Sequence, residues 1–201
     1  MISSDYFIPA VRAVIELEIN KSRFVAYADR AVNRSQALAH LHDVRKLHPA
    51  ATHHCWAYLI GHPRSPVNVA FSDAGEPNGS AGKPILNVLN HNNIGDVMIT
   101  VARYFGGVKL GAGGLIRSYS RATYLALQAL ETQTFMDLKT LTIAGSFELE
   151  QAVRHWFLTR EGGVINVDYK QEVEISLEIR ERDIRELRAF LLARNARVLD
   201  S

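Results

Sequence analysis

Apolar residues in the first part of the chain recur with strand spacing and helix spacing in turn. The strand-like segment at residues 96–104 is apolar enough to lie at the centre of a sheet. Alternating, β-branched or aromatic patterns predict strands over residues 11–19, 22–28, 52–60, 67–72 and 96–104. Apolar residues spaced three to four apart predict a helix capped by Asn33 or Ser35 and ending near Leu47, a short helix opened by Pro84, and an amphipathic helix over residues 113–130.

The last third of the chain has a simpler pattern. Strand-like segments cover residues 138–148, 164–169, 173–179 and 196–199, and helix-like segments cover residues 149–159 and 183–194. The two middle strands predict a hairpin, and Gly162 with Gly163 predicts the end of the first helix. The order β-α-β-β-α-β is that of a ferredoxin-like sandwich. The sequence therefore predicts an α+β fold class with two domains.

Charge divides the chain at a similar place. Residues 1–131 carry 13 Lys and Arg against 9 Asp and Glu, whereas residues 132–201 carry 10 against 12. This asymmetry indicates two units with different surface chemistry. We expect one domain over residues 1–134, with two glycine-rich loops, and a second over residues 135–201.

The overall composition is that of a globular protein. Of the 201 residues, 47% are hydrophobic and 22% are charged, which argues against disordered and low-complexity classes. A single cysteine, Cys55, excludes an intramolecular disulfide and fits a reducing compartment. The N-terminus carries Asp5 and no basic segment, and no apolar run reaches the ~20 residues that span a membrane. We expect a cytoplasmic protein without a membrane partner.

The stretch from Arg103 to Arg121 is the most informative part of the sequence. It places five glycines within residues 106–114, where the predicted helix begins, and it contains four cations and no acid. Glycine lets a backbone approach a ligand closely, and the first turn of a helix has unpaired amides and a partial positive charge. The pattern predicts a site for phosphate or nucleic acid. Its expected residues are Arg103, Lys109, Gly111, Gly113, Gly114, Arg117 and Arg121.

Neighbouring residues bear on the same prediction. Arg117 and Arg121 are four apart and share a helical face, and aromatic residues at positions 104, 105 and 119 offer stacking surfaces beside the cations. The stretch contains neither a P-loop nor a Gly-x-Gly-x-x-Gly pattern. The alternative interpretation is a tight turn that packs a helix against a central strand, in which case Tyr104 and Phe105 belong to the core.

A second glycine-rich loop covers residues 71–85. Three glycines permit unusual backbone angles while two prolines restrict them, so the loop should be ordered. Asp73 and Glu76 are a candidate cation site or acid and base pair; alternatively, they cap backbone amides or pair with Arg103 or Lys109. Ser80 and Lys83 are candidate phosphate contacts.

A histidine and cysteine cluster lies on the predicted strand at residues 52–60. On a strand, His53 and Cys55 point to one face and His54 to the other. Two ligands on one face do not complete a tetrahedral zinc site. We therefore expect neither a metal site nor a cofactor, and the residues are explained by a buried thiol and hydrogen-bonded histidines.

Several motifs together resemble the IMPACT family, and its bacterial YigZ-like branch in particular. They are Ser-Asp-Ala-Gly-Glu-Pro-Asn-Gly-Ser-Ala-Gly-Lys-Pro at residues 72–84, Arg-Tyr-Phe-Gly-Gly at 103–107, Lys-Leu-Gly-Ala-Gly-Gly-Leu at 109–115, Lys-Ser-Arg-Phe at 21–24 and His-His-Cys at 53–55. The resemblance covers roughly residues 15–130. Ala74 departs from the family, which more often has an acidic residue there.

The resemblance implies a fold and a class of function. The first domain is expected to be a βαβ domain similar to the fourth domain of elongation factor G, and the second to be similar to its ferredoxin-like fifth domain. This pairing points to a translation-associated module, non-catalytic or at most weakly catalytic, that binds RNA, ribosomal components or phosphate. One alternative is an enzyme that acts on a small phosphorylated substrate at the two glycine loops. Another is a protein-interaction module in the stress regulation of translation.

Overall fold

The computed structural model describes residues 5–200, without the side chain of Asp200. The chain divides into two compact units, which we call unit 1 (Met1–Phe135) and unit 2 (Met136–Ser201). The domains expected over residues 1–134 and 135–201 differ from these units only in the assignment of Phe135. Residues 1–4 and 201, at the ends of the expected domains, lie outside the described residues.

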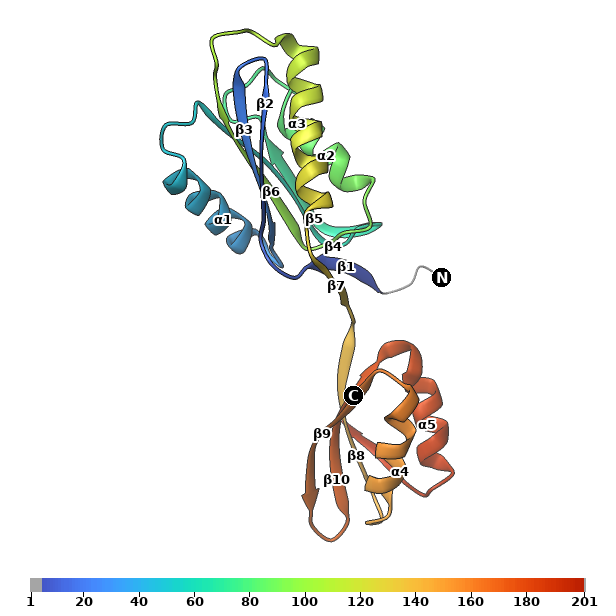
Figure 1. Ribbon diagram of the computed structural model, residues 1–201. Helices are drawn as coiled ribbons and strands as arrows, with labels where there is room; N and C mark the ends of the chain where they lie inside the picture. The colour runs from blue at the N-terminus through green and yellow to red at the C-terminus, as the bar shows by residue number, and fades with distance from the viewer. Residues whose placement is uncertain (1–4, 201) are drawn as a thin grey trace. The chain divides into compact units, whose positions relative to one another are not determined.

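Unit 1 is built on a five-stranded sheet in which every neighbouring pair is antiparallel. In spatial order the strands are β2 (Ala13–Ile19), β3 (Ser22–Arg30), β6 (Val97–Tyr104), β4 (His53–His62) and β5 (Ser65–Ser72). All of β6 except Tyr104 is buried, and it lies at the centre of the sheet (Figure 1). The apolar segment at residues 96–104 therefore has the central place that its composition predicts.

Helices cover both faces of this sheet. They are α1 (Arg34–Leu47), α2 (Gly82–Asn90) and α3 (Gly111–Gln128). The α1 helix lies on one face, and α2 and α3 lie on the other (Figure 1). Because β3 and β4 both pair antiparallel with β6, they run parallel to each other and form a βαβ unit with α1. The α1 helix begins after Asn33, whose side chain accepts a hydrogen bond from the Gln36 amide, as its capping role predicts.

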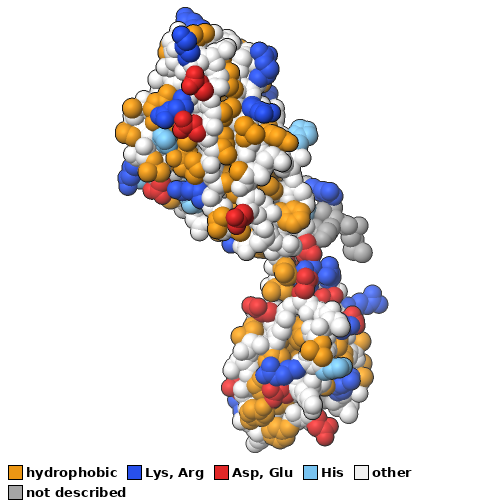
Figure 2. Space-filling model, viewed as in Figure 1, with side chains coloured by type: hydrophobic (Ala, Val, Ile, Leu, Met, Phe, Trp, Pro, Cys, Tyr) orange, Lys and Arg blue, Asp and Glu red, His pale blue; other side chains and the backbone are white. Residues whose placement is uncertain are grey.

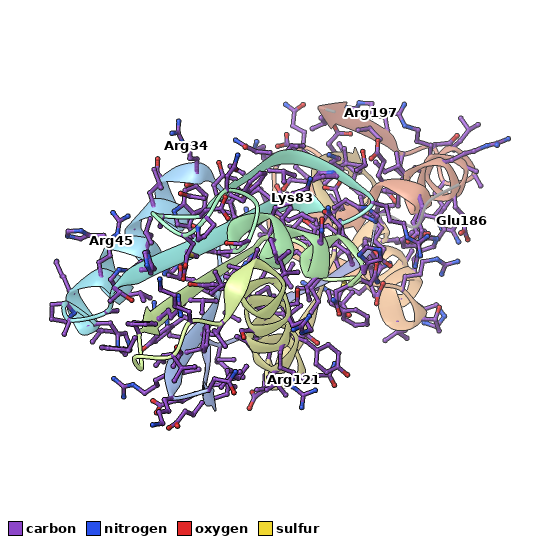
Figure 3. The ribbon with its side chains drawn as sticks, turned by 90° about the horizontal axis from the view of Figure 1, so that it is seen from above. Arg34, Arg45, Lys83, Arg121, Glu186 and Arg197 are labelled. Carbon is purple, nitrogen blue, oxygen red and sulfur yellow. The ribbon has the colours of Figure 1, made fainter. Side chains whose placement is uncertain are left out.

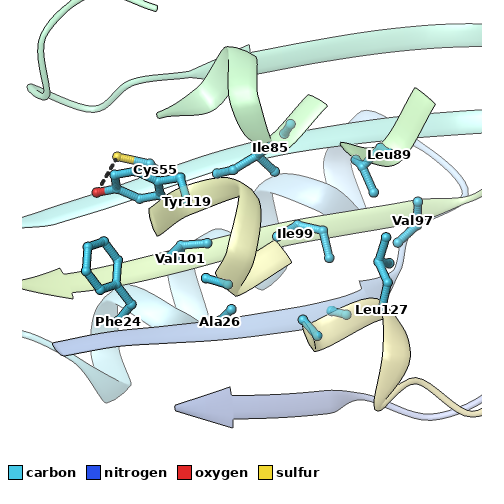
Figure 4. Packing of buried hydrophobic residues seen from close by; sticks show 14 of the residues in the cluster. Phe24, Ala26, Cys55, Ile85, Leu89, Val97, Ile99, Val101, Tyr119 and Leu127 are labelled. Carbon is cyan, nitrogen blue, oxygen red and sulfur yellow. Dashed lines mark hydrogen bonds between the residues drawn. The ribbon is translucent and has the colours of Figure 1, made fainter. Parts of the chain in front are cut away.

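The two faces of the sheet form separate apolar cores because side chains alternate along each strand. Val25 and Tyr58 pack on the side of α1, whereas Phe24 and Ala57 pack beneath α2 and α3. Figure 4 shows the larger core, in which Tyr119 of α3 meets strand residues such as Phe24. This core holds the start of α3 and the start of α2 against the same face of the sheet.

A two-stranded ribbon, which the sequence pattern did not predict, joins the two ends of unit 1. It pairs β1 (Tyr6–Pro9) antiparallel with β7 (Thr132–Phe135). Tyr6 is buried, its ring lies 4.8 Å from that of Phe135, and its hydroxyl donates to Asp96 Oδ2 at 2.9 Å. The ribbon is therefore anchored to the end of the main sheet by side chains as well as by backbone pairing.

Unit 2 is a ferredoxin-like βαββαβ fold. Its elements are β8 (Leu138–Gly145), α4 (Leu149–Trp156), η1 (Phe157–Thr159), β9 (Gly162–Tyr169), β10 (Val173–Arg180), η2 (Glu181–Asp183), α5 (Ile184–Leu192) and β11 (Arg197–Asp200). The antiparallel sheet has the order β11-β8-β10-β9, and both α-helices pack on one apolar core with it. The expected hairpin is the pair β9 and β10.

The protein thus has the α+β, two-domain fold class that the sequence predicts. Two helices begin earlier than expected, since α2 starts at Gly82 rather than Pro84 and α3 starts at Gly111 rather than Gly113. The helical segment expected over residues 149–159 ends with η1 at Thr159 as predicted, and Gly162 and Gly163, the expected stop signal, are the first two residues of β9. Among the described residues, no helix is both long and apolar enough to cross a membrane.

Candidate functional site

Asp73 organises the loop between β5 and α2. Its carboxylate accepts hydrogen bonds from the amides of Gly79, Ala81 and Gly82 at 2.8–2.9 Å. Two of these amides lie at the start of α2, where an anion also complements the partial charge of the helix. Of the alternatives open for Asp73, the capping of backbone amides is the one that the structure shows.

Glu76 reaches from the same loop into the protein interior. Only 9% of the residue is exposed, and its Oε1 accepts from Arg103 Nη1 at 2.8 Å and from the Tyr119 hydroxyl at 2.7 Å. Glu76 therefore pairs with Arg103, which was one of its two expected cationic partners. The pair joins the loop to β6 and α3, so that the carboxylate is part of the internal framework of unit 1.

Arg103 lies inside the protein as well, at the end of β6. It is 5% exposed, and its second terminal nitrogen donates to Ser22 Oγ at 3.3 Å. The same Ser22 oxygen accepts from the Gly106 amide at 3.4 Å. The Nε of Arg103 is buried without a hydrogen-bond partner among the described residues. Arg103 thus connects the β2–β3 turn region to both glycine loops.

Cys55 lies in the buried network beneath the first loop. The Cys55 thiol donates to Asp73 O at 2.9 Å and lies 3.3 Å from the Tyr119 hydroxyl (Figure 4). Burial raises the pKa of Cys55 to about 12 and also raises the pKa of Tyr119. The thiol is therefore protonated at neutral pH and is a poor nucleophile.

The two histidines of β4 serve opposite faces, as strand geometry requires. His53 Nδ1 is hydrogen-bonded to Ala74 O at 3.0 Å, and its Nε2 lies 3.9 Å from Glu76 Oε2. His54 Nε2 is hydrogen-bonded to His48 O on the side of α1. His53 is thus the histidine that meets the first glycine loop. Burial lowers the pKa of His54, which favours its neutral form.

The second glycine loop, between β6 and α3, differs from the first because no side chain among the described residues caps the helix that follows it, whereas Asp73 caps α2. The α3 helix starts at Gly111, which has a φ of +67°, and has no side-chain cap and no acid in its first turn. Gly111, Ala112 and Gly113 are exposed. One end of the loop is fixed, because a Cβ on Gly106 would lie 1.8 Å from Lys21 O. The loop therefore presents an uncapped helix start to solvent from a rigid base.

Three exposed cations lie next to this helix start or on the first three turns of α3. Lys109, Arg117 and Arg121 form no ion pair within the described part of the chain. Figure 2 shows Lys and Arg side chains at the end of unit 1 where α3 begins. Lys83 is exposed on α2, at a place separate from Arg121 (Figure 3). We call the surface formed by Lys109, Arg117, Arg121 and the start of α3 the basic surface. Lys83 is not part of it.

The basic surface contains two shallow hollows, each of about 270 Å³. The first lies between the two glycine loops; we call it the inter-loop hollow. It is lined by Glu76, Pro77, Arg103, Phe105, Lys109, Leu110, Gly111, Ala112 and Leu115. The second is lined by Ile19, Asn20, Leu110, Gly114, Arg117, Ser118 and Arg121. Leu110 borders both hollows and divides the basic surface into two parts.

Three residues that were expected to contact phosphate or nucleic acid lie inside the protein. Ser80 is buried and donates to Pro77 O at 2.6 Å, and Arg103 is paired with Glu76. Tyr119 is fully buried, which corrects its expected role as an exposed stacking surface. The helical spacing of Tyr119 with Leu115, Ala122 and Ala126 was the signal that places it on the core side. We leave these residues out of the basic surface.

Sequence reasoning named Ser22 and Cys55 within the family motifs, but not as residues that support the loops. Ser22 and Cys55 act on the loops from β3 and β4, through contacts that join distant parts of the chain. Their positions on buried strand faces give no signal for these partners. Asp73 and Glu76 each have separate internal partners, and the described residues contain no group of three or more His, Cys, Asp or Glu that could hold a metal ion.

Comparisons with known proteins agree with the sequence motifs. The family model described as the Impact N-terminal domain matches residues 20–127. An IMPACT family member of Haemophilus influenzae is 32% identical over 90% of this chain and 88% of its own length. The IMPACT family member YigZ of Escherichia coli is 34% identical over 92% of this chain and 91% of its own length.

A solved structure supports the same relationship. A crystal structure described as that of a hypothetical protein has a TM-score of 0.71 and 31% identity, and the match covers 100% of this chain and 98% of that one. The likeness thus includes both units, whereas the family model is confined to unit 1. Family model, relatives and motifs agree, and this chain belongs to the IMPACT family.

Proposed function

We propose that this chain is a translation-associated module that binds RNA, ribosomal components or other phosphate-bearing ligands through its basic surface. The observation that carries the proposal is the set of three exposed cations beside and along the first part of α3, together with a helix start that has no side-chain cap and no acid in its first turn. Exposed Lys and Arg contact phosphates, and free amides at a helix N-terminus add further donors. The expected similarity of the two domains to the fourth and fifth domains of elongation factor G motivates the choice of RNA.

The hydrogen bonds of Asp73 and Glu76 favour ligand binding over catalysis on a small phosphorylated substrate. Glu76 is held by Arg103 and Tyr119, and Asp73 is held by three backbone amides. Neither is left as a base beside the cations. The inter-loop hollow, at about 270 Å³, is also smaller than the roughly 300–1,000 Å³ usual for small-ligand sites. A shallow basic surface is the geometry expected for a nucleic-acid backbone.

Charge reversal tests the proposal directly. The double variant Arg117→Glu and Arg121→Glu should weaken RNA binding by at least about tenfold at low salt and reduce the slope of log affinity against log salt by about two. Filter binding or fluorescence anisotropy over a salt series measures both quantities. Thermal unfolding checks that the fold is retained.

A matched control separates this surface from charge in general. Arg34→Glu with Arg45→Glu makes the same charge change on α1, on the other face of the sheet (Figure 3). This control should change the affinity little beyond the long-range effect of net charge. Equal losses in the two double variants, or no loss in the first, would contradict the proposal. A saturable protein partner that is indifferent to both would favour a protein-interaction module.

A further inference from the structure

The inter-loop hollow combines apolar walls with polar groups. Pro77, Phe105, Leu110 and Leu115 contribute apolar surface, and Lys109 lies beside the start of α3. An anion alone would need only the cations and the amides. The apolar walls indicate a ligand that carries a flat or apolar part next to its negative charge.

Phe105 is the main exposed element of this wall. It is 48% exposed although it follows a buried strand, and its ring centroid lies 5.7 Å from Cζ of Arg103. The next residue, Gly106, packs so closely against the β2–β3 turn that a side chain there would clash with Lys21 O. The backbone that follows Phe105 thus contacts this turn, and the aromatic ring lies at the surface instead of packing in the core.

Arg103 supplies an independent sign of a ligand. The residue is 5% exposed and lines the hollow, yet its Nε has no partner within the described residues while both terminal nitrogens have one. Buried donors without partners are rare in folded proteins because each costs free energy. The guanidinium, held by Glu76 and Ser22, thus leaves one donor unpaired within the described chain, in a residue that lines the hollow.

We propose, as an extension of the RNA-binding function above, that the inter-loop hollow takes one unpaired nucleotide of an RNA strand. The base stacks on Phe105 beside the Arg103 guanidinium, and its phosphate faces Lys109 and the amides of Gly111 and Ala112. Aromatic side chains and arginine planes bind bases that are free of a duplex, whereas paired bases are stacked within the helix and out of reach. The small volume fits one base whose phosphate stays outside.

The second hollow fits the same ligand. It lies across Leu110 from the first and carries Arg117 and Arg121. A strand that places one base in the inter-loop hollow has further phosphates on either side of that nucleotide, and these can reach the second pair of cations. A free mononucleotide lacks those phosphates and gains nothing from Arg117 or Arg121.

Binding of three probes tests this inference: a short oligoadenylate, the same strand annealed to its complement, and AMP. The single strand should bind more tightly than the duplex and AMP.

Phe105→Ala should weaken binding of the single strand by about tenfold and leave binding of the duplex unchanged. Tyr124→Ala is the matched control, because Tyr124 is an aromatic residue of unit 1 that is 47% exposed, on α3, but lines neither hollow. A 2-aminopurine base in the oligonucleotide reports stacking by its fluorescence, which should change with the natural protein and not with Phe105→Ala.

The outcomes separate the inference from the function on which it rests. If charge reversal at Arg117 and Arg121 weakens binding but Phe105→Ala does not, the nucleotide site is wrong and the phosphate-binding surface stands. If the duplex binds as tightly as the single strand, the inference is overturned in the same way. If AMP binds as tightly as the oligonucleotide and both depend on Phe105, the ligand is a free nucleotide and the assignment to an RNA strand is overturned. If charge reversal has no effect on any probe, the proposed function itself fails.

Discussion

The two glycine loops of unit 1 look alike in sequence and differ in what their polar groups do. In the loop before α2, Asp73 and Glu76 are bonded to backbone amides, to Arg103 and to Tyr119. In the loop before α3, the helix start has no side-chain cap and Lys109 is exposed. Glycine content therefore does not distinguish a loop that holds a fold together from one that receives a ligand. The difference lies in whether the polar groups already have partners.

The largest effect should follow from breaking the first loop at its buried ion pair. Glu76→Ala leaves the Arg103 guanidinium buried without its anion and removes an acceptor from Tyr119. We expect a loss of about 3–5 kcal/mol in the free energy of unfolding. Urea denaturation measures this loss, and Lys109→Ala in the second loop should change stability by less than about 0.5 kcal/mol. Similar values for the two variants would remove the contrast between the loops.

A second test concerns the capping role of Asp73. Asp73→Asn keeps the shape of the side chain but removes the charge that accepts from Gly79, Ala81 and Gly82. We expect a loss of about 2 kcal/mol, together with faster hydrogen exchange at the start of α2. If stability is retained and only ligand binding changes, Asp73 belongs to a binding site and the first loop resembles the second.

Two glycines of the second loop give a paired comparison. Gly106→Ala places a Cβ 1.8 Å from Lys21 O, so the loop or the β2–β3 turn must move, at a cost of about 2 kcal/mol or more. Gly107→Ala meets no atom within 4 Å and is strained only by its φ of +84°, at a cost of about 1 kcal/mol. The difference between the two unfolding free energies measures how rigid the base of the loop is. Equal losses would indicate a loop without a fixed end.

The smallest expected effect is a pH dependence beneath the first loop. Burial raises the pKa of Cys55 from its ordinary value of 9.0 to about 12, so the unfolded chain loses this proton at lower pH than the folded one. The contribution of Cys55 to the unfolding free energy is therefore fully present below about pH 9 and decreases as the pH rises toward 12, by about 1.4 kcal/mol near pH 10. Cys55→Ala should show a flatter decrease in the unfolding free energy over the same range. Identical alkaline profiles would contradict the assigned pKa.

Local patterns predicted most of the fold but few of the contacts that build the site. The apolar run of β6 and the Asn33 cap are local signals, and both led to the observed elements. The pairing of β1 with β7 joins residues at opposite ends of unit 1, and Thr132–Phe135 is short and largely polar, so periodicity carries no signal for it. The sequence likewise left open whether Glu76 pairs with Arg103 or Lys109, because that choice depends on how β6 and the loop meet in three dimensions.

The site shows the same limit. Glycines, cations and the absence of acids are properties of one short stretch, so they could be read from the sequence at the start of α3. The burial of Ser80 and the fixed position of Phe105 depend on neighbours from other elements. The division of the basic surface by Leu110 has the same origin. Sequence indicated where charge gathers, and only packing decided which groups remain available.

The β1–β7 ribbon imposes an order on the folding of this protein during its synthesis. Translation proceeds from the N-terminus, so Tyr6–Pro9 leaves the ribosome well before its partner Thr132–Phe135 has been made. Unit 1 can acquire this last pairing only when the segment leading into unit 2 emerges. A nascent chain halted at Gln128 would contain every strand of the main sheet but would lack β7, the antiparallel partner of β1, and the Phe135 ring that packs on Tyr6. The first unit is therefore completed at the moment at which the second begins.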